Sequence, residues 1–140
     1  MQYRIATAED YPMLAELNSQ LIRDEGYRNP MTSAQLEERL RGWLTSGEYR
    51  AVLFEEDHEV MAYVLFRETE TEIYLRQFFV VRHRRGEGLG RRAMQEISTL
   101  WPRHKRWTVS GLVTNVAGVA FWRAMGYTDD ELTPKIMPRV

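Results

Sequence analysis

A glycine-rich loop, Arg85-Gly86-Glu87-Gly88-Leu89-Gly90, is the part of this sequence whose residue types most directly indicate chemistry. Glycine adopts positive φ without a steric penalty and lets the backbone approach a ligand closely. Positive charge surrounds the loop, from Arg82, Arg84, Arg85, Arg91 and Arg92. A small polyanion, such as a phosphate group, is the ligand that this combination favours.

The segments on either side of the loop would position it for that task. Residues 72–81 are rich in β-branched and aromatic side chains and predict a strand. Residues 89–101 carry apolar side chains at helical spacing, with polar side chains on the other face. The first amides of a helix lack intrahelical partners and lie at the positive end of its dipole. A strand, a glycine loop and a helix in this order predict a phosphate site.

The nucleotide motifs with defined spacing do not fit this loop. A P-loop ends in Gly-Lys-Ser/Thr, whereas Gly90 is followed by two arginines, and glycines at 86, 88 and 90 miss the dinucleotide fingerprint. The pattern Arg/Gln-x-x-Gly-x-Gly/Ala does fit, through Arg85, Gly88 and Gly90. The loop thereby resembles the pyrophosphate loop of the GCN5-related N-acetyltransferase (GNAT) family. The alternative interpretation is a tight turn with solvated arginines.

A second segment, residues 115–127, is similar to another signature of the same family. In that signature an Asn after a strand opens a helix, with a small residue three positions on, aromatics six and seven positions on, and Gly-aromatic at the end. The matching residues are Asn115, Gly118, Phe121, Gly126 and Tyr127. Trp122 departs from the pattern, because the family usually has Tyr there. The resemblance extends over most of the 140 residues.

The resemblance implies an N-acetyltransferase that uses acetyl-CoA as a co-substrate. The acetyl group would pass to a primary amine of a small molecule or a peptide by direct attack in a ternary complex. The loop amides would bind the pyrophosphate, and the strand before the loop would pair with the pantetheine. The implied cofactor-binding residues are Phe78, Phe79, Val80, Val81, Arg85, Gly86, Glu87, Gly88, Leu89, Gly90, Arg91, Asn115 and Trp122, with Phe121 lining the same groove. Helix capping by Asn115 and plain packing by Trp122 are the alternatives.

The catalytic acid and base are not identified by the sequence. An indole N–H cannot replace the family's tyrosine as a proton donor, so Trp122 leaves that role open. Ser110 stands where some relatives have Glu, and Arg76-Gln77 stands where others have a carboxylate. The remaining candidates are a chain of water molecules, a loop carboxylate, with Glu25 first and Asp24 second, and Tyr127. A non-catalytic acyl-CoA-binding regulatory domain of the same fold is therefore the alternative function.

Composition limits the other classes of function. The chain is 44% apolar and 28% charged, with a net charge of −1, which gives no electrostatic case for nucleic acid or an anionic membrane. It has no cysteine, and its three histidines share no metal-like spacing with carboxylates, so no metal is expected. A signal peptide and an 18-residue apolar run are both absent from the sequence, which favours the cytoplasm. A homodimer is possible.

The expected architecture is a single domain, 1–140, of the α/β (α+β) class, with a mixed central β-sheet flanked by helices. Capping boxes at Thr7 and Thr32 predict two helices that end near Gly26 and Gly47, although Asp10 is an alternative cap for the first. A hairpin of residues 49–54 and 60–66 is expected between the second helix and the strand 72–81. The further elements expected are a first strand at 3–6, a strand at 107–113, a helix at 115–126 and a last strand from 127 toward 137. By resemblance, the strands before and after the glycine loop splay apart.

Overall fold

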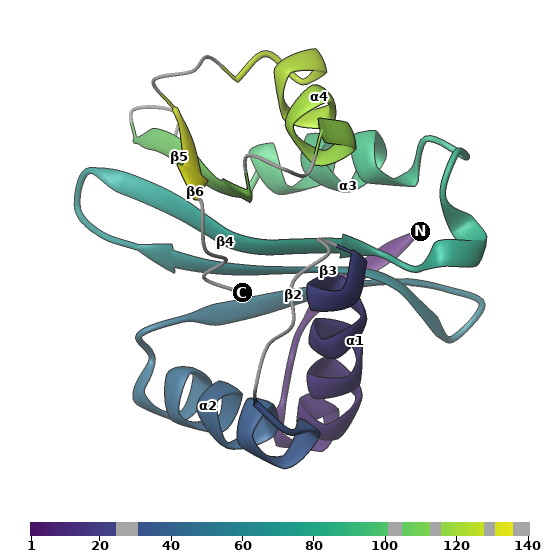
Figure 1. Ribbon diagram of the computed structural model, residues 1–140, viewed down its shortest axis with the longest axis vertical. Helices are drawn as coiled ribbons and strands as arrows, with labels where there is room; N and C mark the ends of the chain where they lie inside the picture. Colours follow the sequence, from purple (N-terminus) through teal and green to yellow (C-terminus); the bar gives the residue numbers. More distant parts are fainter. Residues whose placement is uncertain (25–30, 101–104, 113–115, 128–130, 136–140) are drawn as a thin grey trace.

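The computed structural model describes residues 1–24, 31–100, 105–112, 116–127 and 131–135. Six strands form one sheet in the order β1-β2-β3-β4-β5-β6 (Figure 1). The elements are β1 (Gln2–Ile5), the 3₁₀ helix η1 (Ala8–Asp10), α1 (Tyr11–Asp24), α2 (Ser33–Ser46), β2 (Arg50–Glu56), β3 (Glu59–Glu68), β4 (Glu72–Val80), the 3₁₀ helix η2 (Arg82–Arg84), α3 (Leu89–Ser98), β5 (Arg106–Leu112), α4 (Val116–Ala124) and β6 (Leu132–Lys135). The predicted order of strands and helices is confirmed, and so is the mixed sheet, which is antiparallel up to β4 and parallel beyond it.

Helices cover both faces of the sheet, with α1 and α2 on one side and α3 and α4 on the other (Figure 1). Strand β3 explains this arrangement, because its side chains alternate between two cores. Met61, Tyr63 and Leu65 pack with α1 and α2, whereas Ala62 and Val64 pack with α3 and α4. A strand buried on both faces needs a continuous apolar run, which is what residues 60–66 provide.

The helix ends follow the capping signals of the sequence. Thr32 Oγ1 accepts a hydrogen bond from the Gln35 amide at 3.2 Å, and Gln35 Oε1 accepts one from the Thr32 amide at 2.8 Å. Gly47 ends α2 with φ of 79°. The first helix begins at Tyr11, so Pro12 lies in its first turn, where proline is tolerated. The predicted end at Gly26 lies outside the described residues.

Strand β4 contains a β-bulge that the sequence did not predict. Leu65 of β3 pairs with Gln77, but the next residue, Phe66, pairs with Leu75. Arg76 is therefore an extra residue, and the alternation of side chains shifts at this point. Two consecutive side chains, those of Arg76 and Gln77, consequently face the α1 and α2 side of the sheet.

Strands β4 and β5 separate just beyond this bulge. They pair in parallel only from Glu72–Leu75 to Arg106–Val109. From Val109 to Leu112, β5 pairs in parallel with β6. Among the described residues, no strand pairs with the β5-facing edge of β4 between Arg76 and Val80. The gap that the resemblance implied is thus present, and it lies directly before the glycine loop.

Candidate active site

A cavity of about 560 Å³ lies where β4, the glycine loop and α4 meet. Most of the side chains and backbone segments that the sequence assigned to cofactor binding line it. These are Phe78, Phe79, Val80, Arg85, Gly86, Gly88, Leu89, Gly90, Arg91 and Trp122. Val81 and Glu87 are not among its lining residues, and Asn115 lies outside the described residues.

The glycine loop has the geometry of an anion site. Gly86 and Gly88 have φ of 80° and 78°, and Gly88 directly precedes the first residue of α3. The Arg92 amide bonds the Gly88 carbonyl at 3.1 Å, so the amides of the first turn before it have no intrahelical acceptor. These amides lie at the positive end of the helix dipole beside the cavity.

Gly90 has a different role from the other two glycines of the loop. Its φ is not positive, and a Cβ atom added there would lie 3.3 Å from two ring carbons of Phe121. That distance is shorter than an ordinary van der Waals contact. The lack of a side chain at Gly90 therefore allows α3 to pack closely against α4. A positive φ is not the reason for glycine at this position.

The open edge of β4 presents backbone hydrogen-bonding groups to the gap. The Val81 amide donates to the Met61 carbonyl of β3 at 2.9 Å. Because an antiparallel ladder alternates, the N–H and C=O groups of Val80 and Phe78 point away from β3. The Val80 carbonyl accepts a hydrogen bond from Arg85 Nε at 2.8 Å. The amides of Phe78 and Val80 can therefore pair with an extended ligand in the gap, whereas that of Val81 cannot.

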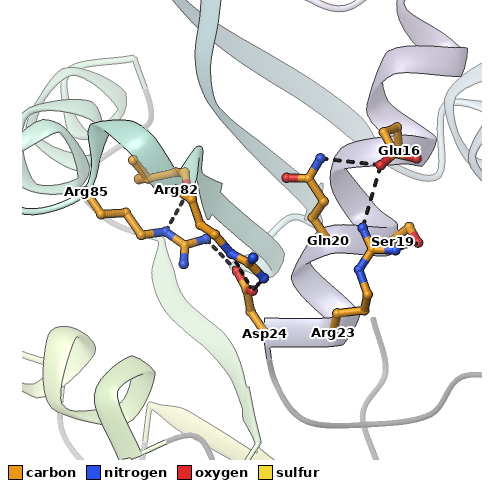
Figure 2. A network of polar contacts seen from close by, with 8 residues as sticks. Glu16, Ser19, Gln20, Arg23, Asp24, Arg82 and Arg85 are labelled. Atoms are coloured by element: carbon orange, nitrogen blue, oxygen red, sulfur yellow. Dashed lines mark hydrogen bonds and ion pairs between the residues drawn. The ribbon is translucent and has the colours of Figure 1, made fainter.

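Asp24, at the end of α1, fixes the loop from the other side of the sheet. Figure 2 shows Arg82 and Arg85 converging on its carboxylate. Arg85 Nη2 lies 2.6 Å from Oδ2, while Arg82 bonds Oδ1. The Arg85 guanidinium also lies 5.0 Å from the centre of the Phe79 ring. The guanidinium of Arg85 thus has three partners, and Arg82 is paired with Asp24 although its side chain remains 65% exposed.

The charge on Asp24 is stabilised by these contacts. Burial acts to raise the pKa of Asp24, but hydrogen bonds from Arg82 and Arg85 outweigh it and hold the pKa below its ordinary value. Of the described residues that line the cavity, Asp24 is the only carboxylate. It is ionised at neutral pH and occupied by two guanidinium groups, which makes it a poor general base.

We expect Asp24→Asn to lower the free energy of unfolding by about 1 kcal/mol at pH 7, because both partners are largely exposed. A lowered folded pKa stabilises the protein above the pKa of an unfolded aspartate, about 3.9. That contribution is lost as the pH falls from about 3.9 through the lowered folded pKa, so the two proteins should converge in acid. Urea unfolding at several pH values measures this, with Glu70→Gln as the control. A difference that does not depend on pH would contradict the assignment.

Of the other two side-chain candidates for proton transfer, the described geometry bears only on Tyr127. Glu25 lies outside the described residues. Tyr127 does not line the cavity and packs edge-on against Trp122, with ring centroids 5.3 Å apart. Burial, and to a lesser extent Glu131, raises the pKa of Tyr127, so its phenol stays protonated at neutral pH.

Trp122 both packs in the core and lines the cavity, two roles that the sequence analysis gave as alternatives. Its side chain is only 7% exposed, and it also forms part of the cavity wall. Its ring lies 5.4 Å from that of Phe78 and 5.0 Å from that of Phe121, measured between centroids. Trp122 is therefore a packed aromatic wall of the cavity.

Sequence reasoning missed the polar residues Arg76 and Gln77 as part of the site. Both line the cavity. Arg76 Nη1 donates to the Tyr49 hydroxyl at 3.2 Å, and Gln77 Oε1 accepts from the Tyr63 hydroxyl at 2.9 Å. Two adjacent polar residues inside an apolar strand were the available signal, but they were considered only as a missing carboxylate.

Two further properties concern metals and membranes. Within the described ranges, no three or more His, Asp or Glu side chains gather in a way that could hold a metal ion. None of the helices that the structure describes is both long enough and apolar enough to cross a lipid bilayer.

Comparison with known proteins agrees with this geometry. The sequence model of the acetyltransferase (GNAT) family matches residues 14–127. No curated protein sequence matches the chain.

Solved structures share the fold. A possible acetyltransferase from Clostridium difficile 630 is 13% identical with a TM-score of 0.79, over 91% of this chain and 90% of that one. A predicted acetyltransferase from Clostridium acetobutylicum, solved with acetyl-CoA, is 17% identical with a TM-score of 0.71, over 91% and 90%. An aminoglycoside 6′-N-acetyltransferase from Acinetobacter haemolyticus is 15% identical with a TM-score of 0.74, over 92% of each chain. At these identities the likeness shows a common fold.

Proposed function

Because this chain belongs to the acetyltransferase (GNAT) family, we propose that it transfers an acetyl group from acetyl-CoA to a primary amine of a small molecule or a peptide. One observation carries the proposal. The cavity joins the amides at the start of α3, which have no intrahelical acceptor, to the edge of β4 with which no described strand pairs beyond Leu75. The amides of α3 suit a phosphate group, and the edge of β4 suits an extended chain that contains amides.

The cofactor would lie along these two surfaces. Its pyrophosphate takes the amides around Gly88 and its pantetheine pairs with the backbone of Phe78 and Val80. Trp122 and Phe121 form the aromatic wall beside it, and both line the cavity. Arg85 holds the loop in place through the Val80 carbonyl and Asp24 and does not act mainly as a phosphate ligand.

The reaction needs little covalent chemistry from the protein. The neutral amine attacks the thioester carbonyl, the resulting oxyanion collapses, and the thiolate of CoA leaves. Well-oriented reactants gain roughly 7–11 kcal/mol from proximity in the best cases. A backbone amide of Phe78 or Val80 stabilises the oxyanion. The proton of the amine passes to solvent or to a carboxylate such as Glu25, since Asp24 is engaged by two arginines.

Acetyl-CoA is expected to raise the melting temperature of the protein. At a hundredfold excess over the dissociation constant, the free energy of unfolding should increase by about 2.7 kcal/mol. NAD and ATP should have much smaller effects, because neither carries a pantetheine for the edge of β4. Differential scanning fluorimetry with the three ligands makes the measurement. The absence of a shift at millimolar acetyl-CoA would argue against the proposed cofactor.

A non-catalytic acyl-CoA-binding regulatory domain is the second candidate. The observation that favours it is Trp122, which stands where the family usually has a tyrosine proton donor. An assay of thiol release with a panel of amines separates the two functions. A binding domain would give the thermal shift with acetyl-CoA but no release of CoA above the rate of spontaneous hydrolysis.

A further inference from the structure

Two arginines from different elements meet at one indole ring on the α1 and α2 side of the sheet. The guanidinium carbon of Arg39, on α2, lies 4.6 Å from the centre of the Trp43 ring. That of Arg76, on the bulge of β4, lies 4.5 Å from the same centre. In the part of the chain that the structure describes, neither forms an ion pair with a carboxylate. Two like charges are thus held together without a counter-charge from any described residue.

The position of Arg39 makes this arrangement costly. Burial, together with repulsion from Arg76, lowers the pKa of Arg39 to about 10. A third arginine, Arg67, lies 5.5 Å from the centre of the Tyr49 ring, and the ring of Tyr49 also contacts Arg76 at 5.6 Å. Isolated positive charges in a partly desolvated region destabilise a folded protein unless an anion offsets them.

The polar atoms around the two arginines lack acceptors. Five side-chain atoms are buried and have no hydrogen-bond partner among the described residues: Asn18 Nδ2, Arg39 Nε, Arg76 Nε, Gln77 Nε2 and Tyr74 Oη. The four nitrogen atoms can only donate, whereas the Tyr74 hydroxyl can donate or accept. A buried donor without a partner costs free energy, and four donors beside one hydroxyl indicate a missing acceptor. A carboxylate supplies two oxygens that accept several hydrogen bonds, and it also supplies the negative charge.

The cluster is connected to the proposed site of acetyl transfer. Arg76 and Gln77 line the cavity that the glycine loop also lines. The β-bulge is the reason that both side chains face this way, because it places two neighbouring residues on one side of the strand. Arg39 does not line the cavity. It is oriented by Asn18, whose Oδ1 accepts a hydrogen bond from Arg39 Nη2 at 3.2 Å. A molecule in the cavity would therefore lie beside Arg76 and Gln77, whose unpartnered Nε and Nε2 atoms are buried.

Resting on the proposed acetyltransferase function, we propose that the acceptor amine carries a carboxylate, which Arg76 and Gln77 bind. Arg76 is the specificity-determining residue of this site. Its Nη1 is held by Tyr49, and its Nε is buried without a partner, so a carboxylate that reached the guanidinium would supply the acceptor that Nε lacks. Arg39 adds positive charge behind it and acts as a positioning residue. Amino acids, or peptides with an acidic group near the amine, are the class of acceptor that this chemistry selects.

The test compares matched ligands that differ only in the carboxylate. N-acetylglycine, N-acetyl-β-alanine and N-acetyl-γ-aminobutyrate, each with its carboxamide, are titrated into the full chain saturated with CoA, by calorimetry. The wild-type protein should bind at least one acid about tenfold or more tightly than its amide. Arg76→Gln should remove that difference, while Arg76→Lys should restore part of it. Arg41→Gln, at an exposed arginine of α2 outside the cavity, should behave as wild type.

The outcomes separate this proposal from the proposed function. Equal binding of acids and amides across the panel by the wild-type protein would overturn the carboxylate site, whatever the variants do. Retention of the preference in Arg76→Gln would overturn the role of that residue. Binding of CoA itself, measured in the wild-type protein and in Arg41→Gln, reports on the acetyltransferase proposal. A ligand-free melting temperature of Arg76→Met at or above that of wild type is also expected, whereas a purely structural arginine would give a lower one.

Discussion

Gly88→Val is expected to raise the KM for acetyl-CoA by at least tenfold while the protein remains folded. Gly88 has φ of 78°, a conformation that a β-branched residue strongly resists. The strain would displace the first turn of α3, whose amides form the proposed pyrophosphate site. A branched side chain would also extend into the cavity that Gly88 lines. Steady-state kinetics with varied acetyl-CoA would measure the change.

The matched control for this variant is Gly47→Val. Gly47 has nearly the same φ, 79°, but it ends α2 and does not line the cavity. It should lose a similar amount of stability, on the order of 1–3 kcal/mol, without a change in KM for acetyl-CoA. Should both variants show the same KM as wild type, the loop would be only a turn. Equal increases in the KM for acetyl-CoA in both variants would indicate a general loss of structure.

Replacement of Trp122 by Ala is expected to lower the free energy of unfolding by about 3–5 kcal/mol, as for other buried aromatic residues. The indole packs against Phe78, Phe121 and Tyr127, so its removal leaves a hole in the wall of the cavity. Trp122→Phe keeps an aromatic ring in that wall. It should retain most of the turnover rate, because an indole N–H does not act as a proton donor to the leaving thiolate. Urea unfolding and thiol release measure the two effects.

The pH profile provides a second readout for the same residue. An amine with a pKa near 10 is mostly charged at pH 7, so activity should rise with pH through one basic limb. The indole does not titrate in this range, and the limb should be the same in wild type and in Trp122→Phe. A fall of more than a hundredfold in Trp122→Phe with the fold intact would show that the indole positions a reactant.

The sequence predicted the order of elements because local patterns determine it. The capping box at Thr32, the terminating glycine at 47 and the continuous apolar run of residues 60–66 each have a counterpart in the structure. The strand, loop and helix around Gly88 were predicted from the same kind of pattern. Within the predicted last strand, 127–137, residues Leu132–Lys135 form β6, and residues 128–130 and 136–137 lie outside the described residues.

The features that the sequence did not predict depend on residues far apart in the chain. The bulge at Arg76 is defined by its partner strand, and residues 73–75 are buried on both faces, so no alternation reveals the shift. The role of Gly90 depends on Phe121 in another helix. The pairing of Asp24 with Arg82 joins positions 58 residues apart. The approach of Arg39 to Arg76 likewise requires α2 to be placed on the sheet.

The extra residue of β4 can be separated from the register of the strand. Deletion of Arg76 would bring Leu75 next to Gln77, and these two side chains already face opposite sides of the sheet. The regular side-chain period of two would therefore be restored, and β4 would pair with β3 without a bulge. Buried Ile73 and Leu75 would keep their face of the sheet, and so would Phe78. We therefore expect the bulge to be a local insertion that adds one side chain beside Gln77, at a position that can be changed or removed while the two halves of the strand keep their partners.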